Sequence, residues 1–175
     1  MIDLKRCNYI TGQTNAVSFG VSKIIDFFEN SGRTPIFLHK KDSTFKNLVH
    51  CSKIEFSNKN ELDVILSNKS NFFRVDILVI DLWFLSNVSQ VISYKKELDL
   101  INIDYVILSS KYHYIEGDPD VNIYKIEAEY SDEHSRRFDT KYLISDIVSN
   151  SKTTMDDLVL AFKRDKKLDD LFGGV

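Results

Sequence analysis

The sequence CNYITGQTNAVSFGVSK, residues 7–23, decides the fold. Its first residues run into Gly12, which predicts a short strand that ends in a turn. The apolar residues after the turn recur at the spacing of one helical face, and they are Val21, Ile24, Ile25 and Phe28. Gly32 then marks the helix end. Strand, turn and helix in this order form the repeating unit of α/β domains.

The rest of the chain continues this alternation. Short apolar runs typical of buried parallel strands occupy 35–38, 75–85 and 104–110, with a weaker one at 49–56. Helical spacing predicts helices over 60–67 and from Ser86. The alternating polarity of 121–130 predicts a half-exposed antiparallel strand at the sheet edge, and another strand lies within 138–148. We expect an α/β fold with a mostly parallel central sheet, flanking helices and an antiparallel edge.

The domain is expected to cover residues 1–148, because the composition changes at a polar linker, 149–154. A C-terminal helix and interaction tail would follow at 155–175. Thr153 or Thr154 is placed to cap that helix, since acidic residues follow in its first turn.

The composition is that of a folded globular chain, with 43% hydrophobic residues, six glycines and two prolines in 175 residues. A formal net charge of −3 argues against coating duplex DNA by bulk electrostatics. No run reaches the roughly 18 apolar residues of a membrane span, so we expect no membrane partner and a cytoplasmic location in a bacterial or phage-infected cell. The two cysteines are too few for a disulfide framework.

The segment from Gly12 to Phe19 has the outline of a phosphate-binding loop without its chemistry. A working loop has Gly, four residues, Gly, Lys and then Ser or Thr, so that backbone N–H groups, an ammonium and a hydroxyl hold phosphate and magnesium. Here Val17 replaces the second glycine, Ser18 the lysine and Phe19 the hydroxyl residue. These replacements remove close backbone approach, charge and the metal ligand together.

The run VDILVID, 75–81, predicts the central strand and ends on a carboxylate, Asp81. With the loop-like segment, this order of elements resembles the RecA-like branch of the P-loop NTPases over about residues 7–110. The resemblance implies that Asp81 would steady a magnesium shell and that Ser109 or Ser110 would stand where a γ-phosphate sensor lies. Leu82 occupies the place where many members carry the catalytic Glu.

The resemblance therefore implies a pseudo-ATPase with no cofactor. The candidate nucleotide-binding residues, if the chain does bind ATP and magnesium, are Gly12, Ser18 and Asp81. In that alternative, Lys23, Lys40 or Lys41 would have to replace the missing loop lysine. Lys23 follows Ser18 by more than one helical turn, which weakens its candidacy.

A second alternative is single-stranded nucleic-acid binding by Lys111, Tyr112, His113 and Tyr114. RecA-like proteins keep DNA-contacting loops in this part of the chain, and adjacent rings can stack on bases. Glu116, Asp118 and Asp120 oppose this interpretation because they repel phosphates.

The chain closes with KKLDDLFGGV, 166–175, whose large apolar residues are Leu168, Leu171 and Phe172. This ending resembles the short C-terminal peptides that hold the sliding clamp in bacterial and phage replication and late transcription, although the usual leading Gln is missing. A last helical turn that folds back on its own domain is the other interpretation.

The four histidines are scattered without HxxxH or HExxH spacing, and neither cysteine belongs to a CxxC pair, so no metal site is predicted. The sequence as a whole favours a non-catalytic accessory or regulatory subunit of a DNA replication, recombination or packaging machine. Its expected partners are proteins, such as a sliding clamp or a true ATPase subunit.

Overall fold

The computed structural model describes residues 6–43, 51–111, 121–129, 141–146, 151–154, 156, 157 and 160. The strands are β1 (Cys7–Gly12), β2 (Pro35–Lys40), β3 (Ser52–Phe56), β4 (Ile77–Asp81), β5 (Tyr105–Ser109), β6 (Val121–Glu129), β7 (Lys141–Asp146) and β8 (Ser151–Thr154). The helices are α1 (Thr14–Asn30), α2 (Lys59–Ser67) and α3 (Val88–Leu98), with a 3-10 turn, η2 (Lys69–Phe72), before β4. The predicted α/β class is confirmed.

The eight strands form one sheet in the order β3-β2-β4-β5-β1-β6-β7-β8. From β3 to β6 all neighbouring strands are parallel. The strand β7 is antiparallel to both β6 and β8. The predicted sheet, mostly parallel with an antiparallel edge, is therefore confirmed.

The expectation that residues 121–130 form an edge strand is wrong. The strand β6 lies inside the sheet, parallel to β1 with Cys7 opposite Val121, and antiparallel to β7 on its other side. Its polar residues Lys125 and Glu127 gave the sequence an edge-like alternation. Both residues line a cavity at the carboxyl ends of the parallel strands, which accounts for polar side chains inside the sheet.

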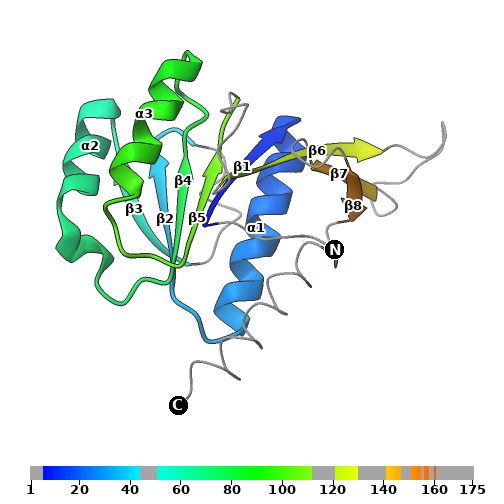
Figure 1. Cartoon of the computed structure of the whole chain (residues 1–175), viewed down its shortest axis with the longest axis horizontal. Coiled ribbons are helices and arrows are strands. Elements are labelled where there is room, and N and C mark those ends of the chain that lie inside the picture. Colours follow the sequence, from blue (N-terminus) through cyan, green and yellow to red (C-terminus); the bar gives the residue numbers. More distant parts are fainter. Residues whose placement is uncertain are drawn as a thin grey trace.

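Helices cover both faces of the sheet (Figure 1). The buried residues of α1 pack against Ile10, Phe37 and Val79, which point to one face. The helices α2 and α3 pack on the opposite face, against alternate strand residues such as Tyr9 and Leu38. The period-2 direction of strand side chains thus divides the interior into two apolar layers.

Asparagine side chains cap the N-termini of α2 and α3. Asn58 accepts a hydrogen bond from the backbone N–H of Glu61, and Asn87 accepts one from that of Gln90, both at 3.0 Å. Each bond satisfies one of the orphan donors of a first helical turn. The third helix therefore starts after Asn87, slightly later than its predicted start, and Ser86 donates its N–H to the Gln90 side chain.

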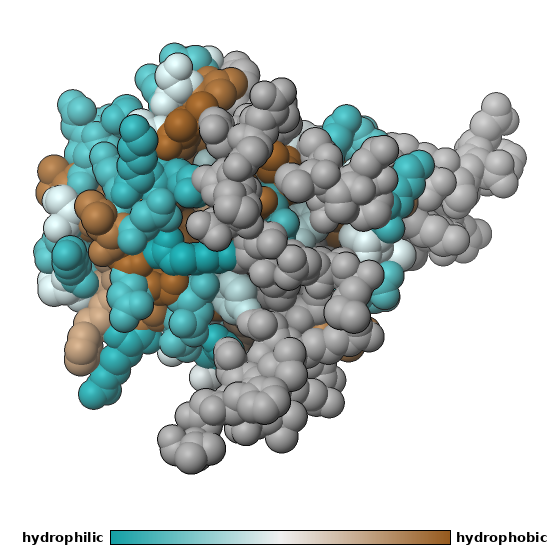
Figure 2. All heavy atoms as spheres, viewed as in Figure 1, coloured by the Kyte–Doolittle hydropathy of each residue, from teal (hydrophilic) through white to brown (hydrophobic). Residues whose placement is uncertain are grey.

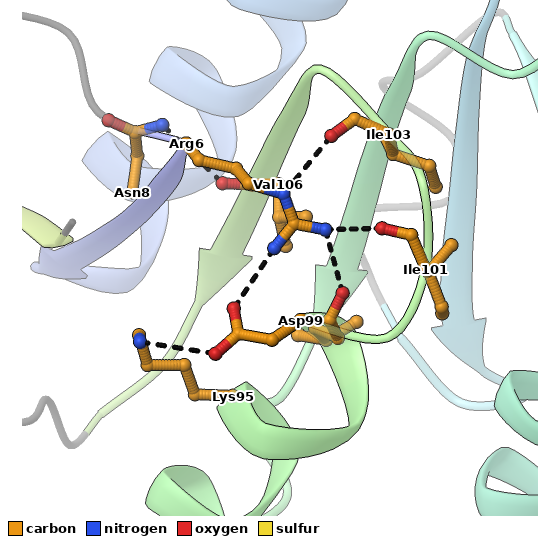
Figure 3. A network of polar contacts seen from close by, with 8 residues as sticks. Arg6, Asn8, Lys95, Asp99, Ile101, Ile103 and Val106 are labelled. Carbon is orange, nitrogen blue, oxygen red and sulfur yellow. Dashed lines mark hydrogen bonds and ion pairs between the residues drawn. The ribbon is translucent and has the colours of Figure 1, made fainter.

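Arg6 binds the C-terminal end of α3 at the amino edge of the sheet (Figure 3). Its guanidinium donates to the backbone oxygens of Leu98 at 2.8 Å, Ile103 at 3.2 Å and Ile101, and it forms an ion pair with Asp99 at 3.0 Å. A cation at this place satisfies carbonyls that a helix leaves unpaired and complements the negative end of the helix dipole.

The segment 149–154, expected as a linker, contains β8, which pairs with β7. Thr154 then accepts a hydrogen bond from the N–H of Asp157 at 3.2 Å, so the predicted threonine cap is present. Residues 161–175 lie outside the described part of the chain.

Figure 2 shows hydrophilic side chains over much of the α2 and α3 region, with apolar ones between them. Exposed large apolar residues on the described surface include Val64, Phe73 and Leu100. Single exposed residues of this kind are ordinary in folded proteins. Within the described ranges, no helix combines the length and apolar character needed to span a bilayer.

Candidate functional site

The carboxyl ends of the parallel strands form the edge of the sheet where α/β proteins usually bind ligands. The strand β1 ends here at Gly12, whose φ is +124°. A Cβ atom on this residue would lie 2.1 Å from the carbonyl oxygen of Ile126 on β6. The next residue, Gln13, donates its N–H to the same carbonyl at 3.2 Å. Gly12 is thus needed for close packing of two strands, whatever else it does.

The segment aligned with a phosphate loop is mostly helix. Since α1 begins at Thr14, only Gln13 separates it from β1. Val17 is completely buried in the apolar layer under α1. The hydroxyl of Ser18 donates to the carbonyl oxygen of Asn15 within the same helix at 3.1 Å. This geometry leaves no extended loop over 14–18 to wrap around a phosphate.

Asp81 ends β4 and joins three parts of this edge. Its carboxylate accepts hydrogen bonds from the Ser43 hydroxyl at 2.7 Å, the Trp83 N–H at 3.0 Å and the Ser109 hydroxyl at 3.4 Å. It is only 5% exposed. These partners account for a buried carboxylate in structural terms, as a cap on the turn after β4.

Ser109 and Ser110, the two predicted sensor candidates, are fully buried. Ser109 faces Asp81 across neighbouring strands, in the register that pairs these two residues. Ser110 donates its N–H to the carbonyl oxygen of Ile10 on β1 at 3.1 Å. The structure therefore brings the ends of β1, β5 and β4 together, with Gly12, Asp81 and Ser109 on three adjacent strands.

A cavity of about 570 Å³ opens beside the turn after β1. Its lining residues come from four neighbouring strands or the turns that follow them, and they are Thr11, Gly12, Gln13, Trp83, Lys111, Lys125 and Glu127. Lys111 was predicted as a nucleic-acid contact, whereas Trp83, Lys125 and Glu127 were not predicted as site residues. The available signal was the charged pair Lys125 and Glu127 on either side of Ile126 in β6.

Two of the lysines considered as replacements for the loop lysine have other neighbours. The ammonium of Lys23 lies 5.3 Å from the ring centroid of Phe19. That of Lys40 lies 5.8 Å from the ring of Phe84 and 3.8 Å from the carboxylate of Asp42. Neither lysine, nor Lys41, is among the residues that line the cavity.

The described histidines, cysteines and acids include no group of three that could hold a metal ion. Cys51 is a free thiol whose pKa is raised to about 11, chiefly by burial and then by the charge of Glu29. A thiol held protonated in this way is a poor nucleophile at neutral pH.

The remaining predicted site residues lie outside the described part of the chain. They are the stacking candidates Tyr112, His113 and Tyr114 and the tail residues Leu168, Leu171 and Phe172. Their predicted roles stay predictions.

Comparison with models of known protein families gives no match, and comparison with curated protein sequences gives none either.

Proposed function

We propose that this chain is a non-catalytic accessory or regulatory subunit of a DNA replication, recombination or packaging machine, built on a pseudo-ATPase domain of RecA-like P-loop type. The observation that carries the proposal is the start of α1 at Thr14, with Val17 fully buried where a working loop has its second glycine. A valine packed in the core cannot act as the open backbone that a phosphate approaches.

The arrangement of strand ends supports the RecA-like part of the proposal. In that family the loop after the first strand, the aspartate and the sensor residue serve one nucleotide, so they must meet at one edge. Here Gly12, Asp81 and Ser109 end three adjacent strands, because β5 lies between β1 and β4.

Two further features support a role without hydrolysis. The carboxylate of Asp81 already accepts three hydrogen bonds from the protein. Leu82 follows it where many members of the family have the catalytic Glu, and this leucine is completely buried. With Ser18 in place of the lysine, the aligned residues supply neither the charge nor the base that phosphoryl transfer needs.

The proposed task is protein binding. A sheet of this kind can pack against a true ATPase subunit through the faces and edges it shares with the catalytic members. The C-terminal peptide with Leu168, Leu171 and Phe172 would deliver the domain to a partner such as a sliding clamp.

The test is an ATP hydrolysis assay with magnesium, carried out on the chain and on Asp81→Ala. We expect neither protein to release phosphate above the blank, because the aligned loop is helical and lacks its lysine. Hydrolysis by the chain that disappears in Asp81→Ala would overturn the proposal and establish an ATPase with an unorthodox phosphate site.

A further inference from the structure

The cavity beside Gly12 gathers side chains that no part of the proposed function uses. Lys111 follows β5, Lys125 and Glu127 belong to β6, and Trp83 follows β4. Residues from separate strands converge here because parallel strands end at one edge. A cavity of about 570 Å³ is within the usual size of small-ligand sites, roughly 300–1,000 Å³.

The charge of this cavity favours an anion. Lys125 forms an ion pair with Glu127 at 2.9 Å, and both side chains are about half exposed. Lys111 is exposed and has no ion-pair partner among the residues that the structure describes. The lining thus contains two ammonium groups and one carboxylate. The first turn of α1, which begins next to Gln13, contains no acidic residue that would offset them.

One part of the wall is aromatic, because Trp83 belongs to the lining. Trp83 is partly buried, packs against the apolar layer under α1 and lines the cavity with its remaining surface. An indole held in place on one side offers a flat surface on which a planar ring can stack. Two lysines and an indole in one small cavity are complementary to a ligand that has an anionic group and a planar ring.

We propose that this cavity binds a small phosphorylated ligand that carries a planar ring, with the phosphate on Lys111 and Lys125 and the ring against Trp83. The binding uses neither the aligned loop residues nor a metal, so it is independent of hydrolysis and of any protein partner. Among the described lining residues the cations are two lysines and the aromatic ring is one indole, which suits one phosphate and one ring better than a polymer.

Trp83 is the only tryptophan among the 175 residues, so its fluorescence reports on this cavity alone. The experiment titrates the full chain with adenosine monophosphate, and separately with inorganic phosphate, in buffer containing EDTA. We expect a saturable change in Trp83 emission with the nucleotide and weaker binding of bare phosphate, because the latter lacks the ring.

Charge variants test the assigned contacts. Lys111→Ala and Lys125→Ala should each weaken nucleotide binding at least about tenfold, since each removes a charge-assisted contact to phosphate. Lys125→Arg should keep most of the binding. Lys96→Ala, on the exposed surface of α3, is the matched control with the same change in net charge, and it should bind as the unchanged chain does.

Glu127→Gln should act in the opposite direction and tighten binding several-fold, because it removes a repelling carboxylate and releases Lys125 from its ion pair. A variant that merely disturbed the fold would not improve binding. Circular dichroism and urea unfolding of each variant confirm that the comparison is between folded proteins.

Three results would overturn this proposal. One is the absence of any saturable change at millimolar adenosine monophosphate. Another is an equal loss in Lys96→Ala and Lys111→Ala, which would indicate nonspecific charge attraction. The third is that oligothymidylate binds more than about tenfold tighter than the mononucleotide with a steep salt dependence, which would assign the site to single-stranded nucleic acid.

Discussion

The backbone at Gly12 is set by its contact with β6. The residue has a positive φ, and any side chain there would meet the backbone of Ile126. Gly32, at the end of α1, has a φ of +76° but no atom within 4 Å of a Cβ position. Both glycines have a positive φ, and they differ in the space around them.

We predict that Gly12→Ala lowers the free energy of unfolding by about 3 kcal/mol or more, because it combines backbone strain with overpacking against Ile126. Gly32→Ala is the control, with an expected loss of about 1 kcal/mol from strain alone. Urea unfolding measures both. Equal losses would show that the close approach of β1 and β6 is not what requires a glycine at position 12.

Asp81 has a structural role that its hydrogen bonds define. Its partners come from the segment after β2, the turn after β4 and the end of β5. A buried carboxylate with several donors is costly to truncate, since each donor loses its acceptor.

Asp81→Ala is expected to destabilise the fold by about 2–4 kcal/mol, because it leaves three donors unsatisfied. Asp81→Asn, which keeps the shape and one acceptor oxygen, should cost less. Unfolding followed by circular dichroism measures the difference. If Asp81→Ala were as stable as the unchanged chain, the hydrogen bonds would not explain the burial of this carboxylate.

At the scale of elements, polar contacts join α2 to α3 and join the end of α3 to the residue before β1. The helices α2 and α3 also contact each other, because Tyr94 of α3 donates its hydroxyl to Asp63 of α2 at 2.8 Å. The ammonium of Lys59, which pairs with the same carboxylate within α2 at 3.0 Å, lies 5.2 Å from the centroid of the Tyr94 ring. Burial, together with the Asp63 carboxylate, raises the pKa of Tyr94. The far end of α3 is held by Arg6, which precedes β1.

Arg6→Ala should lower the free energy of unfolding by about 2–4 kcal/mol, because backbone oxygens at the end of α3 lose a charged donor. The control is Lys95→Ala, which removes an ion pair with Asp99 at 3.4 Å and should cost less than Arg6→Ala. Thermal unfolding distinguishes the two variants. Similar small losses would mean that water replaces Arg6 without penalty.

At the scale of the whole molecule, one sheet separates two apolar layers and aligns the carboxyl ends of six parallel strands. The segment 161–175 lies outside the described part of the chain, and in our proposal it binds a partner.

We predict that Leu171→Ala combined with Phe172→Ala leaves the melting temperature nearly unchanged and abolishes binding to a sliding clamp, since large apolar side chains are the usual anchors of such peptides. Lys166→Ala, in the same tail, is the control for binding. A fall in melting temperature of more than about 4 °C would show instead that the tail belongs to the core, because about 1–2 kcal/mol of packing would have been lost.

Periodicity and apolar runs were enough to find most elements. The buried runs gave β2, β4 and β5, and helical spacing gave α1, α2 and α3 within a few residues. The position of β6 was predicted wrongly. Alternating polar and apolar residues look the same in the sequence whether the polar ones face solvent on an edge strand or line a cavity on an interior strand. The buried pair Asn8 and Asn122, opposite each other on β1 and β6, was not foreseen either.

The sequence by itself determined the α/β class, the mostly parallel sheet and the absence from residues 12–19 of the second glycine, the lysine and the final Ser or Thr of the phosphate-loop pattern, because these depend on local residue types and spacing. Only the tertiary structure decided that Gly12 is pressed against Ile126, that Asp81 is held by three donors and that Lys111, Lys125 and Trp83 share one cavity. These facts depend on which strands become neighbours. Strand order follows from the packing of the whole chain, and no short stretch of sequence encodes it.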